Sequence, residues 1–268
     1  MDDSEPETPM SRSATVHANP LLDERYVDTV RRLGAAQKRA ARGAPPYSIY
    51  VNRPIGRLLA AAAARAGLSP DAVTAISAVF TFTAIVLLAA LPPSWWLGIA
   101  VWLLLAIGYA FDSADGQVAR LRGGGSPAGE WLDHVVDCVK LSSLHLAVLI
   151  TAYRNFDVPT AWLLVPIGFT VVAAVSFFAM ILNDLLKAKH GAPTSLDPSA
   201  PGRRTALRSL LGLPTDYGVT CLVFALLGAP QVFVVAYTLL FAANLGYVLL
   251  ALVKWYRDMS ALAPGGTP

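Results

Sequence analysis

The chain has 268 residues, of which 55% are hydrophobic and 15% are charged, and its formal net charge is +3. A soluble domain carries roughly a quarter charged residues, so this composition argues against an ordinary soluble protein and indicates a membrane protein. The two cysteines, Cys138 and Cys221, lie in apolar stretches and match no metal-binding or disulfide spacing, so we expect small core residues. No feature predicts a nucleic-acid partner.

The N-terminal segment is predicted to lie outside the membrane. Residues 1–20 are rich in Ser, Pro and Glu and poor in large apolar side chains, which is typical of disorder. Residues 21–44 are charged and weakly helical in pattern, which predicts a solvated cytosolic helix; a polybasic segment resting on anionic lipid is the alternative. The chain opens with acidic residues, and its first apolar run begins near Leu58, so no signal peptide is predicted.

Five clear apolar segments and one interrupted segment follow. A helix needs about 20 mostly apolar residues to cross a bilayer. The fifth segment is short, unless it begins near Leu210 with a kink at Pro214. An Ala-rich stretch over residues 53–68 is amphipathic and is expected to lie along the membrane surface. The predicted spans are Ala72–Leu91, Trp95–Arg120, Glu130–Tyr153, Thr160–Leu186, Asp216–Leu227 and Gln231–Trp255.

The distribution of basic residues predicts the orientation of these spans. Of the 21 Lys and Arg residues, ten precede the first span, two lie at the loop after the second, five follow the fourth and two end the sixth. These positions fall on one side of the membrane, which places both termini in the cytosol and needs an even number of spans. We therefore predict an all-α membrane protein with six transmembrane helices and an N-terminal amphipathic juxtamembrane helix.

Four carboxylates, Asp112, Asp115, Asp133 and Asp137, lie in or beside the second and third spans. A charge at the centre of a membrane helix costs roughly 2.5–3.5 kcal/mol, so such groups usually face a polar cavity and serve a function. The first two are three residues apart and the last two are four apart, so each pair shares one helix face. A Gly-rich loop separates the pairs, and an antiparallel hairpin would set them at matched depths along one crevice.

Charges at such close range would repel one another without a cation between them. Magnesium and manganese bind carboxylate oxygens together with phosphate oxygens of a substrate, so the four acids predict a divalent metal site. Gly116 leaves room for a diphosphate, Ala119 keeps the same face narrow, and Arg120 offers a planar donor fork suited to phosphate. Anchoring at the membrane surface is the alternative role for Arg120.

The same residues carry a family resemblance. One continuous pattern resembles, without a gap, the signature of the CDP-alcohol phosphatidyltransferases. It reads Asp112-x-x-Asp115-Gly116-x-x-Ala119-Arg120, then eight further residues, then Gly129-x-x-x-Asp133-x-x-x-Asp137. The resemblance covers residues 50–257 as a membrane domain. It leaves residues 1–49 as a cytosolic, partly disordered N-terminal extension and residues 258–268 as a C-terminal tail.

This resemblance implies the roles of the site residues. Asp112, Asp115 and Asp133 would bind metal with Asp137 alongside, and Asp137 would be the base that takes the acceptor's proton. The implied cofactor is magnesium or manganese, two ions per subunit, in a homodimer in a bacterial cell membrane. The implied nucleotide and diphosphate contacts are Thr74, Gly116, Ala119, Arg120 and Gly129.

The implied function is metal-dependent transfer of a phosphatidyl or other substituted phosphate group in phospholipid biosynthesis. The donor is CDP-linked, expected to be CDP-diacylglycerol, and an alcohol accepts the group with release of CMP. The identity of the acceptor stays open, because two local patterns disagree. Residues 126–134 resemble the choline/ethanolamine phosphotransferases, which transfer a CDP-linked head group to a lipid alcohol. Residues 50–54 instead resemble bacterial members that make inositol-phosphate lipids or di-inositol phosphate.

Several other polar residues have two interpretations. Arg203, Arg204 and Arg208 would bind a phosphorylated acceptor or simply form a basic cytosolic loop. His134 would assist proton transfer or pack structurally, and Lys140 is expected to be a counter-ion of the acids. A membrane ion transporter is the alternative of another class; it is disfavoured because the acids cluster toward the cytosolic helix ends and no internal repeat is seen.

Overall fold

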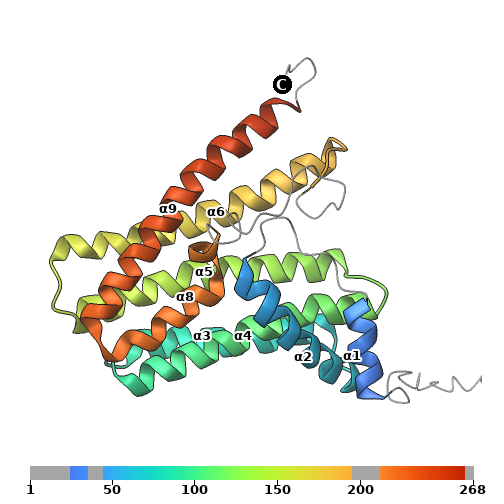
Figure 1. The fold of residues 1–268 in the computed structure, drawn as a ribbon, viewed down its shortest axis with the longest axis horizontal. Helices are drawn as coiled ribbons and strands as arrows, with labels where there is room; N and C mark the ends of the chain where they lie inside the picture. The colour runs from blue at the N-terminus through green and yellow to red at the C-terminus, as the bar shows by residue number, and fades with distance from the viewer. Residues whose placement is uncertain (1–24, 36–44, 195–211, 263–268) are drawn as a thin grey trace, which may run out of the picture.

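The computed structural model describes residues 25–35, 45–194 and 212–262, and within these ranges the chain forms helices and no strand (Figure 1). Helix α1 spans Tyr26–Ala35. The π-helical turn η1, Ser48–Asn52, runs directly into α2, Arg53–Arg65. The disorder predicted for residues 1–20 lies outside the described residues, whereas the helix predicted within residues 21–44 is present as α1.

Long apolar helices make up most of the remaining structure. Among the described residues, five helices are long and apolar enough to cross a bilayer, which makes the chain a membrane protein. Helices α3 to α6 run back and forth along roughly one direction, and α9 lies at a slant to them (Figure 1). The five are α3 (Pro70–Ala90), α4 (Trp95–Leu121), α5 (Pro127–Asn155), α6 (Leu164–Lys189, preceded by the 3-10 turn η2, Thr160–Leu163) and α9 (Pro230–Ser260).

The predicted fifth span is shorter than the others. It consists of the turn η3 (Leu213–Thr215), α8 (Tyr217–Phe224) and η4 (Ala225–Gly228). The eight residues of α8 and the four of η4 rise about 18 Å as a helix, less than the roughly 30 Å hydrocarbon core. The chain does bend beside Pro214, because Asp216 has extended backbone angles between η3 and α8.

Serine caps fix where three of the long helices begin. The side chains of Ser69, Ser94 and Ser126 accept hydrogen bonds of 3.1, 3.1 and 3.0 Å from backbone N–H groups three residues later. Proline follows Ser69 and Ser126 at the first helical position. A backbone N–H at this position has no partner within the helix, so its absence in proline costs no hydrogen bond. The caps set the start of α5, and therefore the depth at which its acidic residues lie.

Helices α3 and α4 pack closely at a glycine. The Ser77 hydroxyl donates a 2.9 Å hydrogen bond to the Gly108 carbonyl. A β-carbon at Gly108 would collide with the Thr81 side chain and lie 3.2 Å from the Ser77 carbonyl oxygen. Small residues permit this close approach of two membrane helices, where dispersion contacts and hydrogen bonds replace the hydrophobic driving force.

Helix α2 packs against the bundle through a face of small residues. Ala60 and Ala61 are fully buried, and with Val73 and Val118 they form part of a core shared with α3 and α4. The apolar face of the amphipathic stretch therefore contacts protein along α4. Beyond it, the Arg122 guanidinium donates to the carbonyls of Gly67 and Leu68 at 2.9 and 2.8 Å, which joins the α2–α3 turn to the end of α4.

Polar groups also connect the far helices of the bundle. His145 on α5 lies 2.7 Å from the Tyr237 hydroxyl on α9, and its ring stacks on Phe169 of α6 with centroids 3.9 Å apart. It is thus a buried histidine with its hydrogen bond satisfied. Cys221 is buried as expected, but the core position expected for Cys138 is wrong, because this residue lies on an exposed face of α5.

We expect Gly108→Ala to separate α3 from α4 and lower the free energy of unfolding by about 1–3 kcal/mol, the usual cost of overpacking. The measurement is the thermal midpoint in detergent. Gly246→Ala on α9 is the matched control, since a β-carbon there meets nothing within 4 Å. Equal midpoints for the two variants would contradict the packing role of Gly108.

Candidate active site

The hairpin of α4 and α5 brings three carboxylates together. Asp112 lies two-thirds of the way along α4, and Asp133 and Asp137 lie in the first half of α5. One carboxylate oxygen from each residue lies within 4.8 Å of the others. All three side chains are partly exposed, so a ligand can reach them. We call these three residues the acidic cluster.

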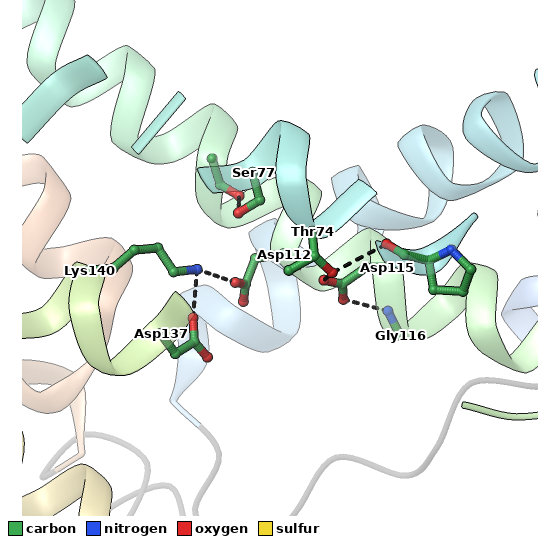
Figure 2. Close-up of polar contacts among 9 residues, drawn as sticks. Thr74, Ser77, Asp112, Asp115, Gly116, Asp137 and Lys140 are labelled. Carbon is green, nitrogen blue, oxygen red and sulfur yellow. Dashed lines mark hydrogen bonds and ion pairs between the residues drawn. The ribbon is translucent and has the colours of Figure 1, made fainter. Parts of the chain in front are cut away.

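Asp115 is turned toward α3. Its side chain is nearly buried and accepts a 2.6 Å hydrogen bond from the Thr74 hydroxyl and a 2.5 Å bond from the Gly116 backbone N–H (Figure 2). Asp115 is therefore outside the group of carboxylates that could share one ion in this structure. Its predicted role as a metal ligand stays a prediction, as does the approach of Thr74 to a nucleotide.

Lys140 lies beside the acidic cluster on α5. Its ammonium group contacts the carboxylate of Asp112 and lies 2.6 Å from that of Asp137 (Figure 2). The lysine side chain is 8% exposed, whereas the two acids are 22% and 25% exposed. Lys140 therefore has the contacts of the counter-ion that the sequence predicted, and it joins α4 to α5.

The acidic cluster fits a hard divalent cation. It offers carboxylate oxygens alone, which are the ligands that magnesium and manganese prefer. Oxygens on opposite sides of a magnesium ion are about 4.2 Å apart, because each bond is about 2.1 Å long. The three oxygens lie within 4.8 Å of one another, a limit somewhat larger than this spacing, so the side chains would have to turn inward to share one ion.

The predicted diphosphate residues lie on the next turns of α4. A β-carbon at Gly116 would have the Arg120 guanidinium, at 3.6 Å, as its nearest neighbour, so the helix backbone is accessible there. Arg120 is close enough to Asp115 and Arg53 to interact electrostatically with both. Ala119 is almost fully buried beneath this turn. The face therefore combines an accessible backbone with guanidinium charge, which suits an anionic group.

Gly129 occupies a tight position at the start of α5. A β-carbon there would lie 2.9 Å from an Asp71 carboxylate oxygen and 3.2 Å from the Ser126 hydroxyl. The structure thus gives this glycine a packing role between α5 and the beginning of α3. Its predicted contact with the nucleotide stays a prediction.

An aromatic group beside the acidic cluster was missed by the sequence reasoning. The Tyr109 ring stacks on Tyr47, with centroids 6.3 Å apart, and meets the edge of Tyr217 at 5.1 Å. Burial raises the pKa of the Tyr47 phenol. The position of Tyr109 three residues before Asp112 was an available signal, because this spacing puts both on one helix face. Tyr47 and Tyr217 come together only through the fold.

Asp216 joins the start of α8 to the N-terminal turn. It is fully buried, and its carboxylate accepts hydrogen bonds from the backbone N–H groups of Ser48 at 3.2 Å and Gly218 at 3.0 Å. The sequence indicated only that a helix begins there.

The remaining site predictions have mixed outcomes. His134 lies 3.9 Å from the Glu130 carboxylate and packs edge-on against Phe177 of α6, contacts that suit a packing role. The predicted acceptor residues Arg203, Arg204 and Arg208 lie outside the described residues.

The sequence model of one family, the CDP-alcohol phosphatidyltransferases, matches residues 68–253. The match covers more than half of the chain and contains α3 to α6, the acidic cluster and Lys140. This chain therefore belongs to the CDP-alcohol phosphatidyltransferase family.

Two curated relatives match shorter segments. Phosphatidylinositol phosphate synthase of Mycobacteroides abscessus is 41% identical over 81 residues, which are 30% of this chain and 35% of that relative. Choline/ethanolaminephosphotransferase 2 of Arabidopsis thaliana is 37% identical over 87 residues, or 32% of this chain and 20% of that relative. The chain thus matches well under half the length of either relative.

Solved structures of Mycobacterium tuberculosis phosphatidylinositol phosphate synthase are also similar. The complex with manganese and citrate has 21% sequence identity and a TM-score of 0.49, and the match covers 81% of this chain and 92% of that one. The structure with CDP-DAG bound has 21% identity and a TM-score of 0.47, with 81% and 97% covered.

We expect Thr74→Val to destabilise the protein by about 1–3 kcal/mol, because it removes the hydroxyl donor of a nearly buried carboxylate without changing the side-chain volume greatly. Thr74→Ser keeps the donor and should restore most of the lost stability. Thermal midpoints in detergent distinguish the two. If the valine and serine variants unfold at the same temperature, the bond to Asp115 is not a stabilising one.

Proposed function

We propose that this protein is a metal-dependent phosphatidyltransferase that moves a phosphatidyl group from CDP-diacylglycerol to an alcohol and releases CMP. The observation that carries the proposal is the acidic cluster, whose oxygens lie within 4.8 Å of one another inside the family's matched region. The name of the mycobacterial relative, a phosphatidylinositol phosphate synthase, supports a phosphorylated inositol as the acceptor.

The residues divide between holding the donor and moving a proton. In the reaction, the acceptor oxygen bonds to the phosphorus that carries the diacylglycerol, and the bond from this phosphorus to the CMP oxygen breaks. CMP leaves with the electron pair, and Asp137 takes the proton of the acceptor hydroxyl. The Gly116 backbone and the Arg120 guanidinium would hold the diphosphate, since they form the accessible cationic face of α4.

Asp112, Asp133 and Asp137 would hold the metal. When bound, magnesium or manganese supplies positive charge that stabilises the leaving phosphate and lowers the pKa of the acceptor hydroxyl. We propose two ions per subunit, with Asp115 as a ligand of the second. Asp115 lies three residues from Asp112 on α4, which supports this assignment.

The Arabidopsis relative is named a choline/ethanolaminephosphotransferase, and its match supports a second candidate, transfer of a CDP-linked head group to a lipid alcohol. The two candidates share the donor diphosphate and the released CMP. They differ in which substrate carries the lipid.

We further propose six membrane spans, a cytosolic N-terminus and C-terminus, and a homodimer. The fifth of these spans is the short segment Tyr217–Gly228, which is apolar and packs against α4 and α9. The basic residues before α3 support the cytosolic assignment. Helix α2 would lie at the membrane surface while its alanine face contacts the bundle. The same proposal divides the chain into an N-terminal extension (residues 1–49), a membrane domain (residues 50–257) and a C-terminal tail (residues 258–268).

The proposal predicts metal-dependent release of CMP from CDP-diacylglycerol by the purified protein. The measurement uses inositol, inositol phosphate, glycerol phosphate and serine as acceptors, with diacylglycerol plus CDP-choline as a separate assay, and identifies the lipid product by mass. We expect product with inositol phosphate and none after chelation of the metal. Release of CMP only from CDP-choline would favour the second candidate, and no release in any mixture would refute both.

Replacing Asp112 and Asp137 separately should distinguish metal binding from proton transfer. Asp112→Asn should weaken binding of metal and donor together, because an amide oxygen holds a cation poorly. Asp137→Asn should keep much of the donor affinity while the chemical step slows by roughly 10²–10⁴-fold, the usual contribution of a positioned base.

The measurements for this pair are CDP-lipid affinity and single-turnover rate at saturating magnesium. Cys138→Ser, on an exposed face of α5 next to Asp137, is a control for a change on the same helix. If Asp137→Asn loses donor binding as severely as Asp112→Asn, then Asp137 is chiefly a metal ligand and the base lies elsewhere.

A further inference from the structure

Lys140 contacts the acidic cluster but has no task in the proposed reaction. Its ammonium group contacts Asp112 on α4 and lies 2.6 Å from Asp137 on α5, so it connects two of the three carboxylates across the helix pair. The lysine side chain is nearly buried. A buried ammonium group in an apolar helix is unfavourable unless it is paired, so these contacts account for its position.

We propose that Lys140 is a built-in cation of the acidic cluster, which holds Asp112 and Asp137 in the metal-free protein and competes with a divalent ion for their oxygens. This inference rests on the proposed function, since it takes the acidic cluster to be the metal site. The sequence predicted a counter-ion, and the structure adds that Lys140 contacts Asp112 on the neighbouring helix as well as Asp137 on its own.

The charge balance explains why this competition matters. With all groups ionised, three carboxylates and one ammonium leave two net negative charges, whereas the carboxylates alone would leave three. A neighbouring positive charge repels an incoming cation, so Lys140 lowers the metal affinity of the free protein. A bound diphosphate brings negative charge to the same site. Metal and donor should therefore each strengthen the binding of the other, by the same factor.

The contacts also predict a structural effect without metal. Asp112 and Asp137 belong to different helices, so their mutual repulsion would push α4 and α5 apart if the lysine were absent. A divalent ion bound between them would remove that repulsion. Loss of Lys140 should therefore make the metal-free protein less stable and increase the stabilisation that metal provides.

The test is manganese binding to Lys140→Met in the absence of nucleotide, measured by the electron paramagnetic resonance signal of free Mn²⁺. We expect this variant to bind manganese about tenfold more tightly than the unaltered protein. Lys140→Arg keeps the charge and should stay close to the unaltered affinity. The thermal midpoint should fall without manganese, and its rise at saturating manganese should exceed that of the unaltered protein.

Lys187→Met is the matched control. Lys187 lies 2.8 Å from Asp258 and joins α6 to α9, so its replacement also removes an ion pair between two helices of the bundle. We expect this control to lower the thermal midpoint without changing the manganese affinity. Equal manganese affinity for Lys140→Met and Lys187→Met would overturn the proposal, because loss of any interhelical lysine would then have the same effect.

Lys140→Gln keeps the test decisive if the methionine variant does not fold. Glutamine retains polarity at nearly the same length but has no charge, and it should also tighten manganese binding; unchanged affinity would again overturn the role of Lys140. The CMP assay separates this result from the proposed function. If the Lys140 variants bind manganese more tightly but the unaltered protein releases no CMP, the built-in cation is supported and the proposed activity is refuted. If the unaltered protein releases CMP but the variants bind manganese with unchanged affinity, the activity is supported and the built-in cation is refuted.

Discussion

Repulsion between carboxylates inside apolar helices is the constraint on which the rest of this structure depends. Asp112, Asp133 and Asp137 offer oxygens within 4.8 Å of one another on two helices that are otherwise suited to a bilayer. Such an arrangement is unfavourable unless cations or hydrogen-bond donors surround it. Lys140 supplies the cation for two of these acids, and Thr74 and the Gly116 N–H supply donors for the neighbouring Asp115. The same imbalance makes the site receptive to a divalent ion.

The parts of the fold around this hairpin keep the acids in register. Ser126 caps α5, and Arg122 ties the end of α4 to the α2–α3 turn. Gly108 allows α3 to approach α4 closely, which brings Thr74 within reach of Asp115. Together, the helix cap and these contacts between distant residues limit how far α4 and α5 can slide along each other. A site that binds metal through several carboxylates needs this precision, because ligand oxygens must lie near the ideal coordination distance.

The two halves of the proposed reaction depend on different parts of the chain. The donor half uses α4 and α5, where one continuous motif supplies acids, a glycine and an arginine. The acceptor half has no such motif, and the edge-to-face pair of Tyr109 and Tyr217 begins one helical turn before Asp112 on α4. Family membership therefore accounts for the donor chemistry more closely than for the choice of acceptor.

The sequence by itself determined the long helices and the likeness of the motif to one family, because hydrophobic runs, serine caps and three- or four-residue spacings are local properties. It placed Asp112, Asp133 and Asp137 on suitable helix faces. Only the tertiary structure decided the hydrogen-bond partners of the buried acids. Asp115 accepts from the Thr74 hydroxyl, and Asp216 accepts from the Ser48 backbone N–H. The tertiary structure also decided that Cys138 is exposed. These outcomes depend on how separate helices rotate and slide against one another, and interhelical packing leaves no periodic signal in a single sequence.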